Sequence, residues 1–169
     1  FKICKRTHPD FYSLDLISEI LSMGHSSRLY NRLVKDKKLF SDIDAFLTGE
    51  SDGGMFVISG KLLEGIEMKK AESAILIELE KLKSELVQER ELSKVKNKVE
   101  SARIFGEMGI LSKAMNLAFF ELLGDVNGVN TDILNYFKVT PGSIKDAANS
   151  YLKVENRCTL YYCVEKVNR

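Results

Sequence analysis

Two histidines, His8 and His25, are the side chains of this 169-residue chain best suited to bind a metal or to transfer a proton. Neither is followed three or four residues later by a His, Cys or carboxylate, the spacing that places two ligands on one face of a helix. His8 precedes Pro9 at a predicted helix start, where we expect it to cap the helix or to meet solvent. The residues therefore predict no metal site.

The turn Gly24-His25-Ser26-Ser27 places a serine hydroxyl beside a histidine base. Neighbouring residues in a turn rarely align as nucleophile and base, and the sequence offers no acid to orient the histidine. Serines before an amphipathic segment are typical helix N-caps. We therefore expect Ser26 or Ser27 to cap the next helix, and we predict no catalytic residue.

Three cysteines, Cys4, Cys158 and Cys163, are too few and odd in number for a disulfide framework. We expect them to be buried thiols that act as small apolar groups. A disulfide between Cys4 and Cys158 stays open as an alternative for an oxidising compartment.

The charge balance excludes several classes of partner. The 25 Lys and Arg nearly cancel the 24 Asp and Glu, so no long-range field would attract nucleic acid or an anionic membrane. No apolar run approaches the roughly 20 residues that cross a bilayer, and the first ten residues contain no signal-peptide core. We expect residues 1–169 to be a single domain excised from a longer protein. Its compartment stays open, and a periplasmic or cell-envelope location fits a bacterial parent.

Hydrophobic periodicity divides the chain into strands and helices. Alternating apolar residues predict strands at 2–6, 40–48, 55–61 and 158–164. Apolar residues at helical spacing predict helices at 11–21, 26–38, 68–86, 92–102, 111–122, 132–137 and 141–152. The last helix has Thr140 as its predicted N-cap and Pro141 in its first turn.

These elements predict an α+β fold. The Gly- and Asp-rich segment 49–54 joins two predicted strands into an antiparallel hairpin. Because isolated short strands are unstable, all strands should share one sheet. We expect a mostly antiparallel sheet of about four strands, covered on one face by helices largely from residues 66–122. The charges of Lys81–Lys98 alternate in sign, which indicates a solvated helix face and not an RNA site.

Four segments, in this order and spacing, resemble one domain of a known peptidase family. They are His8-Pro9-Asp10 with the helix ending at Gly24, Ser26-Ser27-Arg28-Leu29-Tyr30 continuing to Leu39, Gly53-Gly54-Met55-Phe56, and Val139-Thr140-Pro141 continuing to Asn156-Arg157. Together they resemble the C-terminal domain of the inverted-zincin peptidases, the family of pitrilysin, insulin-degrading enzyme and the processing peptidases. The resemblance implies half of a peptidase unit and spans nearly the whole chain.

The resemblance implies that zinc belongs to another domain. In that family an N-terminal domain holds zinc through H-x-x-E-H and a downstream Glu, and the Glu of the motif activates the zinc-bound water. The present chain contains no H-x-x-E-H. We therefore expect zinc in the preceding domain of the parent protein, with that domain and an unfolded peptide as the partners.

The resemblance also implies a lost substrate clamp. Active relatives supply an Arg and, seven residues later, a Tyr, and these positions fall on Val34 and Ser41 when Leu39 is aligned. Valine cannot donate a charged hydrogen bond, and a serine hydroxyl is much shorter than a phenol. Arg32 lies two residues away, on another helix face. No substrate-binding residue of this pair is retained.

Two functions follow from the resemblance. The first is a non-catalytic chamber-wall domain of a zinc metallopeptidase, which encloses a peptide while another domain hydrolyses it. The second is a purely structural or assembly subunit without proteolysis, as in the core subunits of the respiratory cytochrome bc complex. An H-x-x-E-H upstream in the parent protein would favour the first.

Overall fold

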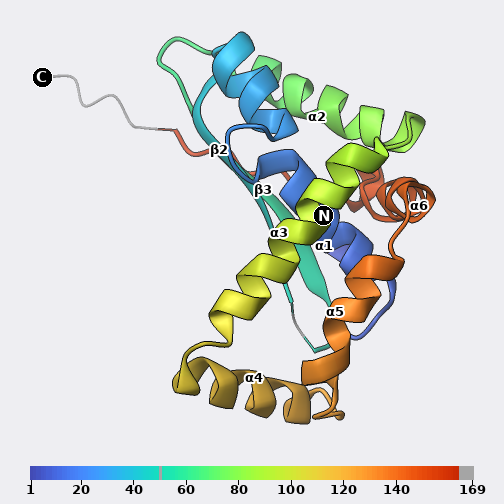
Figure 1. Cartoon of the computed structure of the whole chain (residues 1–169). Helices are drawn as coiled ribbons and strands as arrows, with labels where there is room; N and C mark the ends of the chain where they lie inside the picture. Colours follow the sequence, from blue (N-terminus) through green and yellow to red (C-terminus); the bar gives the residue numbers. More distant parts are fainter. Residues whose placement is uncertain (50, 164–169) are drawn as a thin grey trace, which may run out of the picture.

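The computed structural model describes residues 1–49 and 51–163 and shows an α+β fold (Figure 1). The elements in chain order are β1 (Lys2–Ile3), α1 (Asp10–Ser22), the π-helix η1 (Tyr30–Asp36), β2 (Phe40–Thr48), β3 (Gly54–Leu62), α2 (Met68–Ser84), α3 (Glu89–Gly106), α4 (Ile110–Leu122), α5 (Gly128–Lys138), α6 (Pro141–Tyr151) and the 3-10 turn η2 (Val154–Asn156). The α+β class and the antiparallel hairpin are confirmed.

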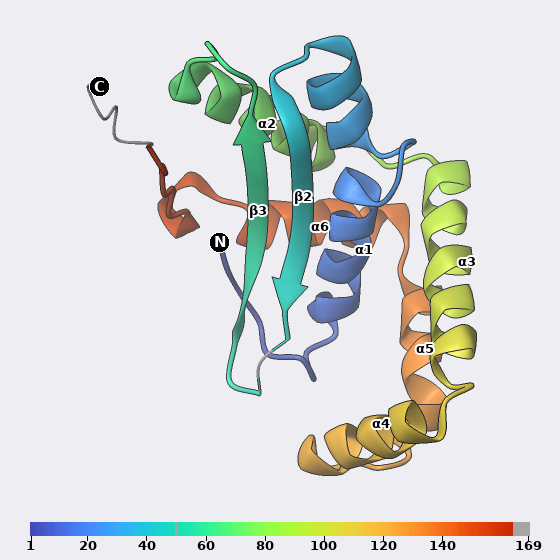
Figure 2. The same ribbon diagram turned by 90° about the vertical axis from the view of Figure 1, so that its left-hand side faces the viewer.

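The sheet has three strands in the order β1-β3-β2, and both pairings are antiparallel. In the hairpin, Ala45 is opposite Ile58 and Phe46 is opposite Val57. Because side chains of a strand alternate between faces, Ile43 and Ala45 point into the core while Asp44 and Phe46 point to solvent. One face of the sheet is therefore packed against helices and the other is open (Figure 2).

The predicted fourth strand at 158–164 is wrong for the residues described. Residues 158–163 are in no strand, and Val164 lies outside the described part of the chain. The hydroxyls of Thr159 and Tyr161 donate instead to the Glu72 carboxylate of α2, at 2.7 and 2.6 Å. A β-branched and aromatic sequence fits a pleated surface, but it forms a strand only where a sheet edge pairs with it.

Helix α1 covers the inner face of the sheet, and this corrects the expectation that helices from 66–122 do so. Its residues Leu14, Leu16, Ile17 and Leu21 are completely buried. It lies between β2 on one side and α3, α5 and α6 on the other. This helix is therefore a core helix, packed on several sides, although it also carries the half-buried acids Asp10, Asp15 and Glu19.

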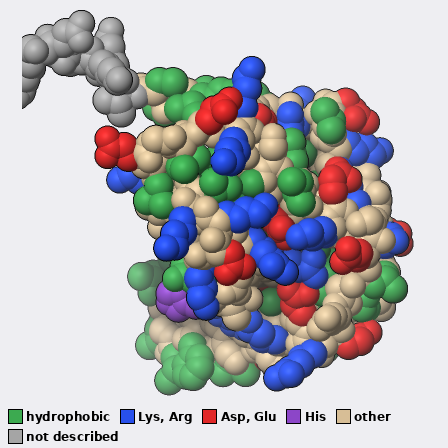
Figure 3. All heavy atoms as spheres, turned by 90° about the horizontal axis from the view of Figure 1, so that it is seen from above, with side chains coloured by type: hydrophobic (Ala, Val, Ile, Leu, Met, Phe, Trp, Pro, Cys, Tyr) green, Lys and Arg blue, Asp and Glu red, His purple; other side chains and the backbone are tan. Residues whose placement is uncertain are grey.

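Several helix ends follow from the local sequence. The Thr140 hydroxyl accepts a hydrogen bond from the Ser143 amide at 3.1 Å, and Pro141 opens α6, as predicted. On α2, Lys81 pairs with Glu78 and Lys83 with Glu80, each at 2.7 Å. Lys and Arg side chains stand beside Asp and Glu on the face seen in Figure 3, which is typical of a solvated surface. No helix within residues 1–49 and 51–163 is long and apolar enough to span a membrane.

Candidate functional site

The two predicted clamp positions lie on consecutive elements, η1 and β2. Val34 is in the π-helix η1, where its half-buried side chain packs against the hydrophobic core. Ser41 is exposed near the start of β2, and its hydroxyl donates to the Lys61 carbonyl at 3.1 Å. Arg32 faces solvent and pairs with Asp36 at 3.7 Å, one turn away on the same element. These contacts are structural, and none of them involves a catalytic group.

The backbone around these positions is irregular. The register of the hairpin shifts between Phe40 and Asp42, which leaves Ser41 as the extra residue of a β-bulge. Just before it, η1 ends at Asp36, and two residues later Lys38 has a φ of 49°, which lies in the left-handed region. π-Helices and bulges are found preferentially at functional sites, because each re-aims a side chain. The segment from η1 to the start of β2 is therefore a candidate site on backbone geometry alone.

The open face of the hairpin changes from charged to apolar along its length. Cross-strand neighbours on this face are Asp42 with Lys61, Asp44 with Ser59, Phe46 with Val57, and Thr48 with Met55. The end near η1 is charged, and the end near the hairpin turn is apolar, with Phe46 and Met55 both exposed. Such a face can contact an extended peptide through its apolar side chains, but it holds no nucleophile beside a base.

The histidines and cysteines are dispersed. The His8 imidazole accepts a hydrogen bond from the Asp10 amide at 3.1 Å, at the start of α1, whose N-cap residue is Pro9. The His25 ring packs edge-to-face on Tyr30, with 4.7 Å between the ring centroids. The three cysteines are free thiols, and Cys158 and Cys163 are exposed, contrary to the expectation of burial. In the described part of the chain, no three His, Cys, Asp or Glu side chains cluster as a metal site.

The expected N-cap from Ser26 or Ser27 is wrong. Neither hydroxyl caps η1, because the helical backbone already begins before Tyr30. Ser27 is buried and its hydroxyl has no partner, while the Ser26 hydroxyl accepts from the Lys94 ammonium of α3. Ser27 therefore lies directly before the helical residues Arg28 and Leu29, and its carbonyl oxygen accepts from the Asn31 amide, but its hydroxyl does not cap the helix; Ser26 contacts α3 instead.

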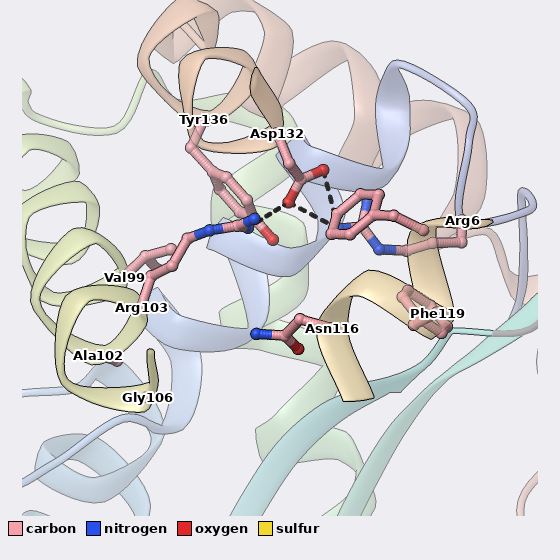
Figure 4. A pocket seen from close by; sticks show the side chains of 10 residues that line it. Arg6, Val99, Ala102, Arg103, Gly106, Asn116, Phe119, Asp132 and Tyr136 are labelled. Atoms are coloured by element: carbon pink, nitrogen blue, oxygen red, sulfur yellow. Dashed lines mark hydrogen bonds and ion pairs between the residues drawn. The ribbon is translucent and has the colours of Figure 1, made fainter. Parts of the chain in front are cut away.

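A buried carboxylate, Asp132 of α5, is the most highly connected polar side chain of the helical layer (Figure 4). Arg6 donates to both of its oxygens at 3.0 and 2.9 Å, and Arg103 of α3 donates at 2.7 Å. The Tyr12 hydroxyl of α1 donates at 2.7 Å. One carboxylate thus joins the segment after β1 to α1, α3 and α5.

The Asp132 cluster borders a cavity of about 290 Å³ that Asn116 and Phe119 of α4 also line. Burial alone would lower the pKa of Arg6, but the Asp132 carboxylate together with Tyr136 and Tyr12 more than offsets this effect, and the pKa of Arg6 is raised. A carboxylate has about four lone-pair sites, and the hydrogen bonds from Arg6, Arg103 and Tyr12 occupy all of them, so none is left for a substrate proton. The cluster is therefore a structural hub and not an acid–base centre.

Sequence reasoning missed the Asp132 cluster. Asp132 stood only as the first residue of a short predicted helix, while Arg6 belonged to a predicted strand. One signal was available, because Asp132, Ile133 and Tyr136 share a helix face that is otherwise apolar. An acid on such a face requires buried hydrogen-bond donors. The sequence does not identify Arg6, 126 residues away, as the donor.

The comparison with protein families decides which domain this is. The sequence profile of the family described as "Peptidase M16 inactive domain" matches residues 1–99. The chain belongs to this family. The inverted-zincin resemblance is thereby confirmed, and the chain is an inactive M16 domain of the zinc-protease family.

Known bacterial proteins agree with this assignment. A zinc protease, PqqE, from Helicobacter pylori is 24% identical over 161 residues, which are 95% of this chain and 36% of that protein. The inactive peptidase domain of a putative zinc protease from Bordetella parapertussis is 26% identical, with a TM-score of 0.89 over 99% of this chain and 91% of that domain. A protease structure from Helicobacter pylori is 25% identical, with a TM-score of 0.84, covering 90% of this chain and 36% of that one. The M16 domain thus spans about a third of the length of the H. pylori relatives.

Proposed function

We propose that this M16 domain forms part of the wall of a peptidase chamber, in which a separate zinc-binding domain cleaves an unfolded peptide. The observation that supports this role most directly is the open face of the β2–β3 hairpin. That face is charged at one end and apolar at the other, with Phe46 and Met55 exposed. Exposed apolar side chains on such a surface can contact an extended peptide without strong sequence selection, because hydrophobic contact is non-directional.

In this proposal the partner domain carries out the peptide hydrolysis. Zinc would be held there by the H-x-x-E-H set that this chain lacks. The proposed contribution of the M16 domain is shape, apolar contact and exclusion of water. Val34 and Ser41 occupy the positions of the family clamp, so the domain would not hold the substrate backbone through a charged pair.

The alternative function is a structural or assembly subunit without proteolysis. The observation that favours it concerns the two clamp positions. Val34 packs against the hydrophobic core, and the Ser41 hydroxyl donates a hydrogen bond to a carbonyl of the same hairpin. The full-length sequence discriminates between the two functions. An H-x-x-E-H upstream of this domain supports the chamber, whereas its absence throughout the protein supports the structural subunit.

The test of the chamber wall uses the full-length protein and an unstructured peptide substrate. Phe46→Ser combined with Met55→Ser removes the apolar end of the open sheet face. We expect KM to rise about fivefold, because each lost contact costs roughly half to one kcal/mol. Ile77→Ser on α2 is the matched control, since Ile77 is similarly exposed but lies away from this face.

Two results would contradict the proposal. One is an unchanged KM for the sheet-face variant, with folding verified by circular dichroism. The other is full peptidase activity in a folded protein from which residues 1–169 have been deleted, because an open chamber would admit water and leave the partner domain unsupported. Either result would favour the structural subunit.

A further inference from the structure

Helix α4 (Ile110–Leu122) has a body-facing side and an outer side. Phe120, which is buried, holds the helix to the body. Its ring lies so close to Gly128, at the start of α5, that an added Cβ there would be 2.4 Å from it. The Arg103 guanidinium lies 5.6 Å from the centre of the same ring. Away from this contact, α4 extends beneath the other helices (Figure 2).

The outer side of α4 is apolar. Leu111, Met115, Ala118 and Leu122 recur at spacings of four, three and four residues, which place them in one stripe along the helix. At about 100° per residue this stripe lies roughly opposite Phe120. The exposed fractions of Leu111, Met115 and Leu122 are 74%, 64% and 79%. The face turned away from the domain is thus the apolar one.

The end of α3 and the following turn add to this surface. Ile104, Phe105 and Met108 are each more than half exposed. Single exposed apolar side chains are ordinary on a protein surface, but a continuous helical stripe of them marks an interaction site. We use the name outer α4 surface for Phe105, Met108, Leu111, Met115, Ala118 and Leu122.

We propose that the outer α4 surface is the docking face for the zinc-binding domain of the same protein, and that an apolar helix face of that domain covers it. The partner's identity rests on the proposed function, whereas the presence of a covered face does not. About two-thirds of the length of the H. pylori relatives lies outside the region this chain matches, so a covalently linked neighbour is available. Tethering gives such a neighbour an effective concentration in the millimolar range, far above that of a second copy.

The composition of the surface fits a permanent contact. Leu and Met dominate the stripe, and an a/d-like spacing suits packing against another helix. Obligate interfaces are more apolar than transient ones and resemble a domain core cut in half. The outer α4 surface also lies beyond residues 1–99, the part that the family profile matches.

The experiment measures cysteine labelling in the full-length protein. Met115→Cys places a thiol in the stripe, and Lys113→Cys places one on the same helix, near the side of Phe120 but exposed. Maleimide labelling is followed by peptide mass spectrometry, which separates the new thiol from the native cysteines. We expect Met115→Cys to react at least tenfold more slowly than Lys113→Cys, and to become as reactive when Leu111→Glu and Leu122→Glu are added.

Equal labelling rates for the two thiols in the folded protein would overturn the proposal. Protection of Met115→Cys that disappears on dilution, together with a halved mass in sedimentation, would overturn it as well, because the occupant would then be a second copy. The peptidase assays are independent of this readout. If Phe46→Ser with Met55→Ser leaves KM unchanged, the chamber-wall role is contradicted. Slow labelling of Met115→Cys would still support the docking face.

Discussion

Arg6 and Asp132, 126 residues apart in the sequence, form a buried ion pair in which one guanidinium nitrogen donates to both carboxylate oxygens at 3.0 and 2.9 Å. Arg103 donates to the same carboxylate. The pair fixes α5 against the first residues of the chain. It therefore helps to hold α5, to which α4 connects, in place.

Asp132→Ala should destabilise the domain by about 3 kcal/mol, because Arg6 and Arg103 would stay buried without their counter-charge. The measurement is the free energy of unfolding in urea. The control is Asp36→Ala, which removes the exposed Arg32–Asp36 pair and should cost less than about 0.5 kcal/mol. Equal losses for the two variants would show that the Asp132 cluster does not stabilise the fold.

Gly54→Ala should disrupt the start of β3, since an added Cβ would lie 2.0 Å from the Thr48 carbonyl oxygen. The neighbouring Gly53→Ala is the control, because its Cβ would meet the nearest atom at 3.5 Å, an ordinary contact. We expect a loss of about 2 kcal/mol or more for the first and a change within about 0.5 kcal/mol for the second. A tolerated Gly54→Ala would contradict the hairpin geometry.

Lys38→Gly should stabilise the domain by about 0.5 kcal/mol. The left-handed backbone at Lys38 costs a side-chain-bearing residue about 1 kcal/mol, and the greater freedom of an unfolded glycine offsets part of the gain. Lys37 lies next to it with an ordinary helical φ of −85°. Lys37→Gly should therefore destabilise by about 0.5 kcal/mol, because an unfolded glycine has more conformational freedom. Thermal unfolding of both variants tests whether their effects have opposite signs.

Asp15→Asn should become more favourable relative to wild type as the pH rises from 3.5 to 7. Burial raises the pKa of the Asp15 carboxyl, and the hydrogen bond from Tyr136 offsets part of this shift. A raised carboxyl pKa favours folding below the unfolded pKa of about 4, and this contribution is lost as the pH rises through the folded pKa. Asparagine keeps an oxygen acceptor for Tyr136 and does not titrate. Urea unfolding at both pH values measures the difference, and a pH-independent difference would contradict the prediction.

Val34→Arg combined with Ser41→Tyr restores the residue types of the family clamp in the full-length protein. We expect turnover of an unstructured peptide to change by no more than about tenfold, the effect of one charge-assisted hydrogen bond. The single variant Ser41→Tyr is the control, since it lacks the added charge. A change of several hundredfold would mean that the missing clamp, and not the chamber, limits activity.

Local patterns in the sequence predicted most of the secondary structure. The 3.6-residue period located α1 to α6, and Thr140 with Pro141 located the start of α6, because caps and amphipathic faces depend on neighbouring residues. The inverted-zincin resemblance led correctly to the M16 inactive domain. It could not show what Val34 and Ser41 contact, since those contacts involve the core and strand β3.

Only the tertiary structure decided which apolar faces are covered. The sequences of α1 and α4 are both rich in leucine and isoleucine, yet α1 is enclosed by the sheet and three helices while the stripe of α4 faces solvent. In the same way, residues 158–163 have a strand-like sequence but pair with no sheet edge. Asp132 pairs with Arg6, which lies near the other end of the chain. Burial and ion pairing depend on which residues meet in space. The sequence pattern shows that a buried charge needs a partner, but it does not show which residue that partner is.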